Sequence, residues 1–429
     1  MKKVLSLLEN KSAFGVFSIL WKIISDLSYS GYVVKYFEYA GFVDQFSYSA
    51  YILGWFVFSI GLFLSPKILN KPSDLFISLF FLIVVTPSLT FISYSNVYDY
   101  TAIIVLFLSY TFMVFFCNNK IVKSIRIPYI KDGEKIFKFF SISLVIYLIF
   151  WYIISGAISN FNLDLSKVYD FREINADLTN VGFLAYLNSW VYQVFTVALM
   201  SYALLKKNYI SFFGLCLVQV FFFGINGHKS ILFTPVIIYI IYFYFSFTKA
   251  LSILPFLLLI LIGGLFWFSF YEPYSIFPSM FIRRTFFVPS HLTFTYFDFF
   301  SNHSFNYWSN SVMKYFMSEI YPDGVSKEIG KYLNTETNAN NGFISSGFAQ
   351  FGILGVAIYV VVFSYLIKIC DYLSYQVGSN WFSICLLIVP VRNIYLSSDL
   401  LTSLLTHGFL IAILVLVFAR SAKNNRFLS

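Results

Sequence analysis

Charged residues are scarce in this sequence. They make up 11% of its 429 residues, whereas ordinary soluble domains carry roughly 25%. Hydrophobic residues reach 59%, and the mean hydropathy is +0.76. A chain this apolar would aggregate in water, so the composition excludes a soluble domain and indicates a membrane protein.

Several signatures of catalysis and nucleotide binding are also missing. The sequence contains no DxD, no HExxH, no GxxxxGK[ST] and no GxGxxG. Metal-ligand spacings of His, Cys and carboxylates are absent, and the four cysteines lie in or beside apolar runs without a CxxC. These absences argue against an ATPase, a zinc protease and a nicotinamide enzyme, and we expect no metal and no cofactor.

Long apolar runs fill most of the chain. A spanning helix needs roughly 20 mostly apolar residues, and about twelve ranges qualify, so we predict an all-α polytopic membrane protein. The first range is the least apolar, because it holds Lys22 and Asp26, which can pair and neutralise each other four residues apart on a helix. The ranges are 12–33, 46–65, 73–93, 100–118, 137–156, 181–204, 208–226, 229–248, 250–270, 343–368, 380–398 and 400–419.

The loops between these ranges differ in charge. If the N-terminus and every second loop share one side, that side holds 18 of the 29 Lys and Arg residues and 5 of the 20 Asp and Glu residues. The positive-inside rule then predicts that both termini are cytoplasmic. The net charge of +9 reflects this sorting and does not indicate a nucleic-acid partner.

The loop lengths divide the chain into three parts. Residues 1–270 hold nine predicted helices with short loops, 271–342 form one large non-cytoplasmic loop, and 343–429 hold three helices and a cytoplasmic tail. A loop of that length is usually functional. Its own apolar pieces, in PSMFIRRTFFVPSHLTFTYFDFF, predict short helices at the membrane surface.

Five cations break the positive-inside pattern near the predicted outer edge. An Arg at helix mid-depth costs about 2.5–3.5 kcal/mol, so Arg392, below Pro390, is expected to face a cavity. Snorkelling to headgroups or pairing with Asp399 is the alternative. For the Arg pair in FIRRTFF the alternatives are phosphate binding and headgroup anchoring. The five are Arg172, Lys229, Arg283, Arg284 and Arg392.

Two histidines and one amide-rich stretch are further candidates. His228 in the turn NGHKS and His291 in VPSHLTF can act as general bases, because free His has a pKa near 6.5. A helix cap or an interface hydrogen bond is the alternative role. In NTETNANNGFISSGFAQFG the amides can bind sugar hydroxyls, or they can simply shape a capping loop.

Three stretches together resemble one enzyme family. They are NGHKS, RRTFFVPSHLTFTYFDFFSNHSFNYWSNS and TNANNGFISSGFAQFGILGV, in this order on this topology. The chain is similar here to the O-antigen polymerases of the Wzy type. The resemblance implies about twelve helices, a large periplasmic loop and a GT-C-like, membrane-embedded glycosyltransferase architecture in the bacterial inner membrane, with the active site facing the periplasm.

The resemblance also implies a reaction. Such enzymes join undecaprenyl-diphosphate-linked oligosaccharide repeat units, which are both donor and acceptor, into O-antigen or related surface polysaccharide. The transfer is inverting and metal-independent. A chain-length regulator and other polysaccharide-assembly proteins are expected partners, besides membrane lipid.

Roles for the candidate residues follow from this resemblance. The catalytic candidates are His291, Arg284 and His228. The donor diphosphate would be bound by Arg283, Arg284, Lys229, Arg172 and Arg392. Sugars would be bound by Asn338, Asn340, Asn341, Gln350, Tyr296 and Asp298, the last also a candidate base.

Two other functions share some of these features. An O-antigen ligase uses the same lipid-diphosphate donor but a lipid A-core acceptor. A flippase for lipid-linked oligosaccharide would place polar residues along a path through the membrane, whereas the unusual cations here gather on one predicted side.

Overall fold

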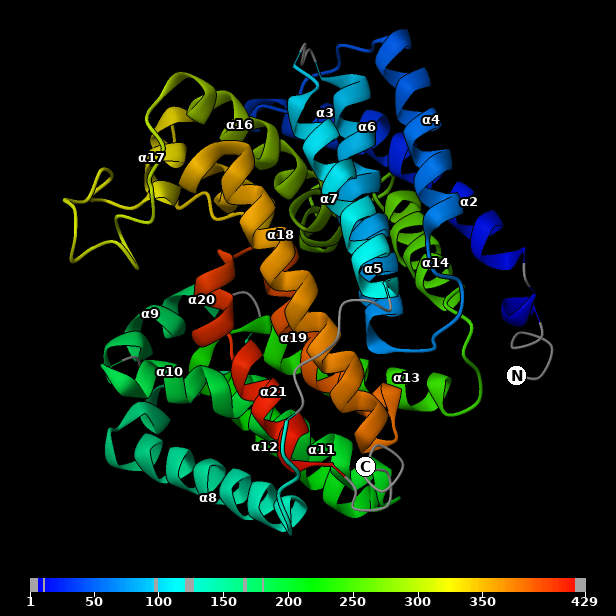
Figure 1. The fold of residues 1–429 in the computed structure, drawn as a ribbon. Coiled ribbons are helices and arrows are strands. Elements are labelled where there is room, and N and C mark those ends of the chain that lie inside the picture. Colours follow the sequence, from blue (N-terminus) through cyan, green and yellow to red (C-terminus); the bar gives the residue numbers. More distant parts are fainter. Residues whose placement is uncertain are drawn as a thin grey trace. The chain divides into compact units, whose positions relative to one another are not determined.

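The computed structural model describes residues 7–10, 12–95, 99–119, 127–164, 168–179 and 181–420, and within these ranges the chain is helical (Figure 1). Seven helices are long and apolar enough to cross a membrane. They are Pro72–Tyr94, Thr101–Asn118, Gly133–Ile154, Phe183–Leu205, Tyr209–Asn226, Phe343–Val377 and Leu400–Phe418.

Helices occupy each of the other predicted ranges as well. Four are apolar but shorter, namely Tyr48–Leu64, Lys229–Phe245, Ile253–Phe268 and Asn380–Leu396. The range 12–33 is filled by α2 (Ala13–Ser28) and the π-helical η1 (Tyr29–Val33). The prediction of a helical membrane protein therefore agrees with the structure, and the count of about twelve crossings stays a prediction.

The chain divides into two compact units. Unit 1 combines Met1–Lys123, Lys249–Ile367 and Ile394–Leu400. Unit 2 combines Ser124–Thr248, Lys368–Asn393 and Leu401–Ser429. Each unit gathers segments that are distant in sequence, and the division at residues 270 and 342 that the loop lengths suggest stays a prediction.

Unit 1 is built around a fully enclosed helix. Its elements besides α2 and η1 are α3 (Val34–Phe37), η2 (Glu38–Ala40), α4 (Tyr48–Leu64), α5 (Pro72–Phe80), η3 (Phe81–Val85), α6 (Thr86–Tyr94), α7 (Thr101–Asn118), α14 (Ile253–Phe268), α15 (Ile276–Pro278), η6 (Ser279–Phe287), α16 (Val288–Asn302), α17 (Val325–Tyr332) and most of α18 (Phe343–Val377). The run from α5 to α6 is apolar all round and 94% buried over its most apolar window, as expected for a helix surrounded by others.

The first helix of unit 1 contains the expected ion pair. Lys22 and Asp26 on α2 are both buried and bond directly. Lys22 Nζ also donates to Thr90 Oγ1 at 3.2 Å, and Thr90 donates to Asp26 Oδ1 at 2.7 Å. The prediction of a mutually neutralising pair is confirmed, and α6 supplies a third partner.

The long 271–342 connection contributes one helix to the bundle of unit 1. Its helix α16 buries most of its residues and contacts both α6 and α7. Ser88 Oγ donates to Ser290 Oγ at 3.3 Å, joining α6 to α16. Helix α16 is therefore part of the bundle of unit 1.

Helix α18 is not continuous. Phe351 (φ −156°) and Gly352 (φ 59°, ψ −144°) leave the helical conformation, so a short helix of residues 343–350 precedes a longer one of residues 353–377. A Cβ on Gly355 would lie 2.1 Å from Gly347 O, so the backbones of the two pieces touch where these glycines meet. The sequence predicted one spanning helix over residues 343–368. In the structure the chain instead leaves the helical conformation at Phe351 and Gly352 before the longer helix begins.

Unit 2 is a bundle of the remaining helices. Its elements are α8 (Gly133–Ile154), η4 (Ala157–Asn160), α9 (Val168–Thr179), α10 (Phe183–Trp190), η5 (Val191–Phe195), α11 (Thr196–Leu205), α12 (Tyr209–Asn226), α13 (Lys229–Phe245), most of α19 (Asn380–Leu396), α20 (Leu400–Leu405) and α21 (Phe409–Phe418). The π-helical turn η5 interrupts the Phe183–Leu205 helix, and such turns often mark functional positions because they re-aim side chains.

Candidate functional site

Basic side chains from four segments of unit 2 lie within electrostatic range of one another. Arg172 and His407 both act on the charge of His228, and Arg392 acts on His407. The Tyr192 ring, on η5, lies 5.8 Å from the His228 ring. We call Arg172, His228, Arg392 and His407 the basic cluster.

The turn NGHKS brings His228 to Arg172. Gly227 has φ 65°, a conformation that glycine adopts without strain, and a Cβ there would lie 2.9 Å from both Arg172 Cβ and Val168 O. Helix α9 can therefore lie directly on this turn. His228 itself is extended (φ −83°, ψ 106°) immediately before α13 begins at Lys229.

A buried hydrogen-bonded triangle supports the same turn. Asn188 Nδ2 donates to Asn226 Oδ1 at 2.7 Å, and Asn226 Nδ2 donates to Tyr152 Oη at 2.8 Å. Tyr152 Oη donates back to Asn188 Oδ1. A fully satisfied buried network of this kind holds its members in one arrangement, so it fixes the end of α12 from which His228 projects.

Arg392 reaches η5 through a chain of amides. Its Nη1 donates to Asn393 Oδ1 at 3.1 Å, and Asn393 Nδ2 donates to Gln193 Oε1 at 3.4 Å. The Arg392 side chain is exposed, whereas Asn393 and Gln193 are buried. The bond to Asn393 uses one of the five N–H donors of this guanidinium, so other donors can bond a ligand.

The electrostatics of the basic cluster keep His228 neutral. Burial, with smaller effects from Arg172 and His407, lowers the pKa of His228 to about 4. At neutral pH the imidazole is therefore uncharged and one of its nitrogens can accept a proton. A bound anion would favour the charged form and raise this pKa.

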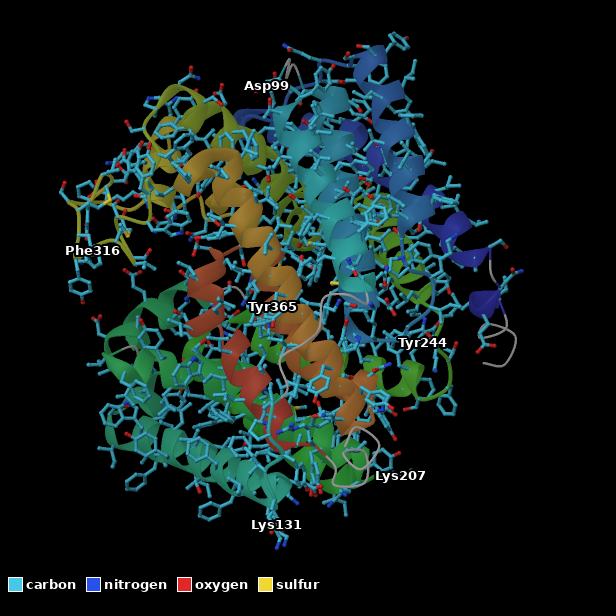
Figure 2. All side chains as sticks on the ribbon, viewed as in Figure 1. Asp99, Lys131, Lys207, Tyr244, Phe316 and Tyr365 are labelled. Atoms are coloured by element: carbon cyan, nitrogen blue, oxygen red, sulfur yellow. The ribbon has the colours of Figure 1, made fainter. Side chains whose placement is uncertain are left out.

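A second feature lies wholly within unit 1. A cleft of about 660 Å³ runs along α16, and we call it the α16 cleft. His291, Thr295, Asp298 and Asn302 line it at spacings of four, seven and eleven residues, which place them on one helical face. Asp99, labelled in Figure 2, contributes from the start of α7.

His291 is wedged between aromatic rings in this cleft. Its ring lies 5.5 Å from the Phe91 ring and 5.3 Å from the Phe42 ring. A Cβ on Gly41 would lie 2.9 Å from His291 Cε1, so only glycine fits there without a shift. Burial lowers the pKa of His291 to about 4, so the ring is neutral at pH 7.

The α16 cleft offers carboxylates and hydroxyls. Tyr332 Oη donates to Asp298 Oδ2 at 2.6 Å, and Asp99 Oδ1 accepts from Thr101 N at 2.8 Å. Neither Lys nor Arg is among the residues found to line the cleft in the described ranges. Such a lining suits the hydroxyl groups of a neutral sugar better than a diphosphate.

The Arg pair of the 271–342 connection faces a different neighbourhood. Arg283 Cζ lies 4.3 Å from the centre of the Phe37 ring, and its Nη2 donates to Ser279 Oγ at 3.4 Å. Burial, and to a lesser extent Arg284, lowers the pKa of Arg283. Arg284 is exposed.

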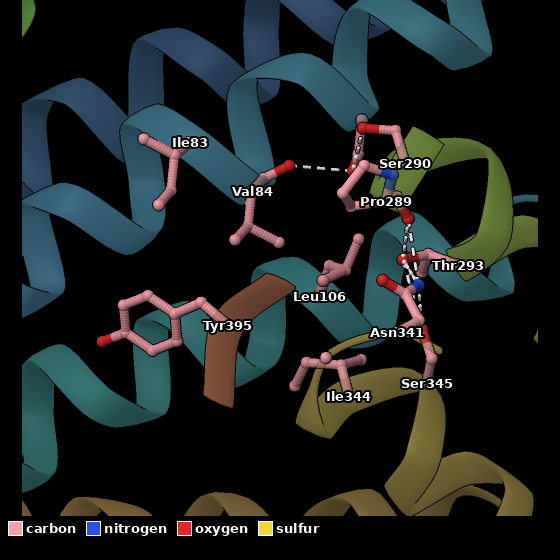
Figure 3. A pocket seen from close by; sticks show the side chains of 12 residues that line it. Ile83, Val84, Leu106, Pro289, Ser290, Thr293, Asn341, Ile344, Ser345 and Tyr395 are labelled. Carbon is pink, nitrogen blue, oxygen red and sulfur yellow. Dashed lines mark hydrogen bonds between the residues drawn. The ribbon is translucent and has the colours of Figure 1, made fainter. Parts of the chain in front are cut away.

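Two of the predicted sugar-binding residues hold the fold together. Asn341 is buried, and its Nδ2 donates at 3.0 Å to Pro289 O and to Thr293 Oγ1 (Figure 3). Tyr296 Oη donates to Ala339 O at 2.9 Å. These bonds connect α16 to the segment leading into α18, so both side chains already have structural partners.

The other sugar candidates are placed in two ways. Gln350 Oε1 accepts from Asn306 Nδ2 at 2.9 Å and from Trp308 N at 2.7 Å, which fixes the 306–308 segment against the break in α18. Asn338 and Asn340 are exposed. Among the predicted sugar-binding residues, Asp298 is the one that lines the α16 cleft.

The cations that the sequence singled out fall into both units. Arg172, Lys229 and Arg392 belong to unit 2, with Arg172 and Arg392 in the basic cluster, whereas Arg283 and Arg284 belong to unit 1. The convergence of all five on one diphosphate therefore stays a prediction.

Sequence reasoning assigned no functional role to three residues of these sites. Asp99 precedes the apolar run 100–118, where an acidic residue that bonds a helix start could have been recognised. His407 lies just before Gly408, whose φ is 76°. A glycine turn inside an apolar run was the sequence signal that could have pointed to His407. Tyr332 carries no such signal, because only tertiary packing brings it to Asp298.

Comparisons with protein-family models, curated proteins and solved structures find no match. In the described ranges, no three His, Cys, Asp or Glu side chains gather as metal ligands. The case for function therefore rests on the residues and geometry of this chain.

Proposed function

We propose that the protein is a membrane-embedded glycosyltransferase of the Wzy type, which polymerises undecaprenyl-diphosphate-linked oligosaccharide repeat units at the periplasmic face of the bacterial inner membrane. The proposal takes up the sequence resemblance and gives its two substrates separate sites. The basic cluster of unit 2 is the candidate site for the donor diphosphate, and the α16 cleft of unit 1 is a candidate site for sugar hydroxyls.

The basic cluster carries this proposal. Cations are costly in a helical membrane protein and usually serve a ligand or an ion. Here Arg172 acts on a neutral His228, Arg392 acts on the neighbouring His407, and Lys229 follows His228 directly in sequence. A lipid-linked diphosphate combines an anion for the cluster with a polyprenyl tail for the apolar helices.

The chemistry requires only what these residues supply. The anomeric carbon of the donor sugar loses its bond to a diphosphate oxygen and gains a bond to the acceptor hydroxyl oxygen on the opposite face. The electron pair of the broken bond leaves with the diphosphate, whose growing charge the guanidinium groups stabilise. The hydroxyl proton passes to a base, for which His228, His291 and Asp298 are the candidates.

One reconstitution tests the proposal. The purified protein in detergent is mixed with its lipid-diphosphate-linked repeat unit and a chelator, without nucleotide sugar, and the products are separated on a gel. A ladder of multiples of the repeat unit is the expected result. The variant Arg392→Ala, shown to be folded by size-exclusion chromatography, should lose the ladder.

The alternative functions give different results in the same assay. A ligase would leave the repeat unit unjoined until a lipid A-core acceptor is added, and would then transfer to that acceptor. A flippase would produce no new glycan but would move the labelled lipid across the bilayer of a proteoliposome. Either outcome would overturn the polymerase proposal.

A further inference from the structure

A second pocket of unit 2 has no part in the proposed reaction. It has a volume of about 490 Å³ and lies where α8 begins, α11 ends and α12 begins. Figure 2 labels Lys131 and Lys207 at this same end of unit 2, which is basic. We call this pocket the lysine pocket, after Lys138 and Lys206 in its wall.

The lining of the lysine pocket changes along each helix. Nearest the helix ends it is polar, and about one turn further in it is apolar. On α8 Lys138 is followed by Ile142, and on α11 Leu199 lies further in than Tyr202. On α12 and the residue before it, the order is Asn208, Ser211, Gly214 and Leu215. A pocket with a polar mouth and an apolar depth fits an amphiphile rather than a small soluble anion.

The mouth of the pocket carries a net positive charge. Lys138 Nζ lies 3.4 Å and Lys206 Nζ 3.8 Å from Glu134 Oε1, so two ammonium groups share one carboxylate. Both also lie over the Tyr202 ring, at 4.5 and 5.3 Å from its centre. The side chains of Lys138 and Lys206 are 30% and 54% exposed, so both are accessible to a ligand.

The start of α12 adds to this charge. The helix runs for 18 residues from Tyr209, and a helix N-terminus carries a partial positive charge that favours anions. Asn208 Oδ1 accepts from Ser211 N at 3.0 Å and so orders this first turn. The helix end and the two lysines face one pocket mouth.

We propose that the lysine pocket binds an anionic phospholipid, with its phosphate between Lys138, Lys206 and the start of α12 and with one acyl chain along Ile142, Leu199 and Leu215. Basic pockets between spanning helices recognise such headgroups at the side where basic loops gather. This site is independent of the proposed glycosyl transfer.

Lipid binding to the purified protein tests the inference. Phosphatidylglycerol and phosphatidylcholine are titrated separately onto delipidated protein in detergent, and bound lipid is counted by native mass spectrometry. Phosphatidylglycerol should bind more tightly. The variant Lys138→Gln/Lys206→Gln should weaken it by about fivefold per lysine, with no effect on phosphatidylcholine.

Two further variants separate the headgroup from the acyl chain. A Cβ on Gly214 meets no atom within 4 Å, so Gly214→Leu fills the apolar depth without altering a charge, and it should weaken lipid binding too. Lys135→Gln is the matched control, because Lys135 is 80% exposed, pairs with Asp132 and does not line the pocket. If the double lysine variant fails to fold, the binding of phosphatidylglycerol to Gly214→Leu tests the inference instead.

Three outcomes would overturn the inference. Equal binding of the two lipids would show that the pocket does not recognise an anionic headgroup. Full phosphatidylglycerol binding by Gly214→Leu would place the lipid elsewhere. Displacement of the lipid by millimolar inorganic phosphate would show that free phosphate, and not a lipid, is the ligand of the pocket.

Discussion

The two units present opposite chemistry. Unit 2 gathers Arg172, His228, Arg392 and His407 into a basic cluster, whereas the α16 cleft of unit 1 is lined by Asp99, Asp298 and Tyr332, with no Lys or Arg found in the described lining. A diphosphate and a sugar need such different surroundings. The comparison teaches that the cations of the basic cluster and the candidate bases of the α16 cleft have different neighbours, although FIRRTFFVPSH places another Arg pair close to His291 in the sequence.

The largest effect is expected from the basic cluster. Arg392→Ala should reduce polymer formation by about 10²–10³-fold, the range seen when a group stabilising developing negative charge is removed. Quantified gel ladders from equal amounts of folded protein measure it. Lys314→Ala is a control, since Lys314 pairs with Glu319 in the 271–342 connection. An unchanged ladder from Arg392→Ala would show that this guanidinium does not stabilise the diphosphate. The proposed difference in function between the two units would then be wrong.

A somewhat smaller effect is expected from the α16 cleft. His291→Gln and Asp298→Asn should each lower the rate by about 10²-fold, the lower end for loss of a base, because a pKa of about 4 makes His291 a weak one. Retention of lipid diphosphate by the purified variants should stay normal. Loss of that retention would mean that this cleft, too, binds the donor.

Packing inside unit 1 can be tested without substrate. Gly355→Ala should lower the free energy of unfolding by about 3 kcal/mol, because its Cβ would meet the backbone of Gly347 at 2.1 Å. Gly264→Ala is the matched control, since that Cβ has open space. Melting curves in detergent compare the two, and equal melting temperatures would contradict the close contact within α18.

The smallest expected effect is a dependence of stability on pH. His228 and His291 have pKa values near 4 in the fold and near 6.5 when unfolded, so the unfolded chain binds more protons between these values. Stability should fall as pH drops from 6.5 to 4, by about 1–2 kcal/mol per histidine once partial exposure is allowed for. His228→Gln and His291→Gln should each reduce the change of the free energy of unfolding with pH. The first removes the titrating histidine of unit 2, and the second removes that of unit 1. Unchanged slopes would show that neither histidine is buried as described.

Local sequence patterns predicted the helices well. Apolar runs of spanning length predict helices because apolar side chains are favoured both in lipid and in the protein interior. The pairing of Lys22 with Asp26 was also readable, because spacing along one helix determines it. The turn NGHKS was recognised for the same local reason.

Features that depend on distant partners were not readable. Glycine is common inside membrane helices, so Gly352 gave no sign that α18 breaks there. Asn341 looked like a sugar ligand until Thr293, 48 residues away, proved to be its partner. The π-helical turns that carry Tyr192 and Arg283 likewise arise from packing and leave no pattern in composition.

The break in α18 has a consequence for how this protein enters the bilayer. The piece of residues 343–350 is about 12 Å long, less than half of a hydrocarbon core of roughly 30 Å. It cannot be threaded into lipid as an autonomous segment during synthesis. Its place beside the longer piece therefore depends on packing, and the close backbone approach of Gly347 and Gly355 is part of that packing.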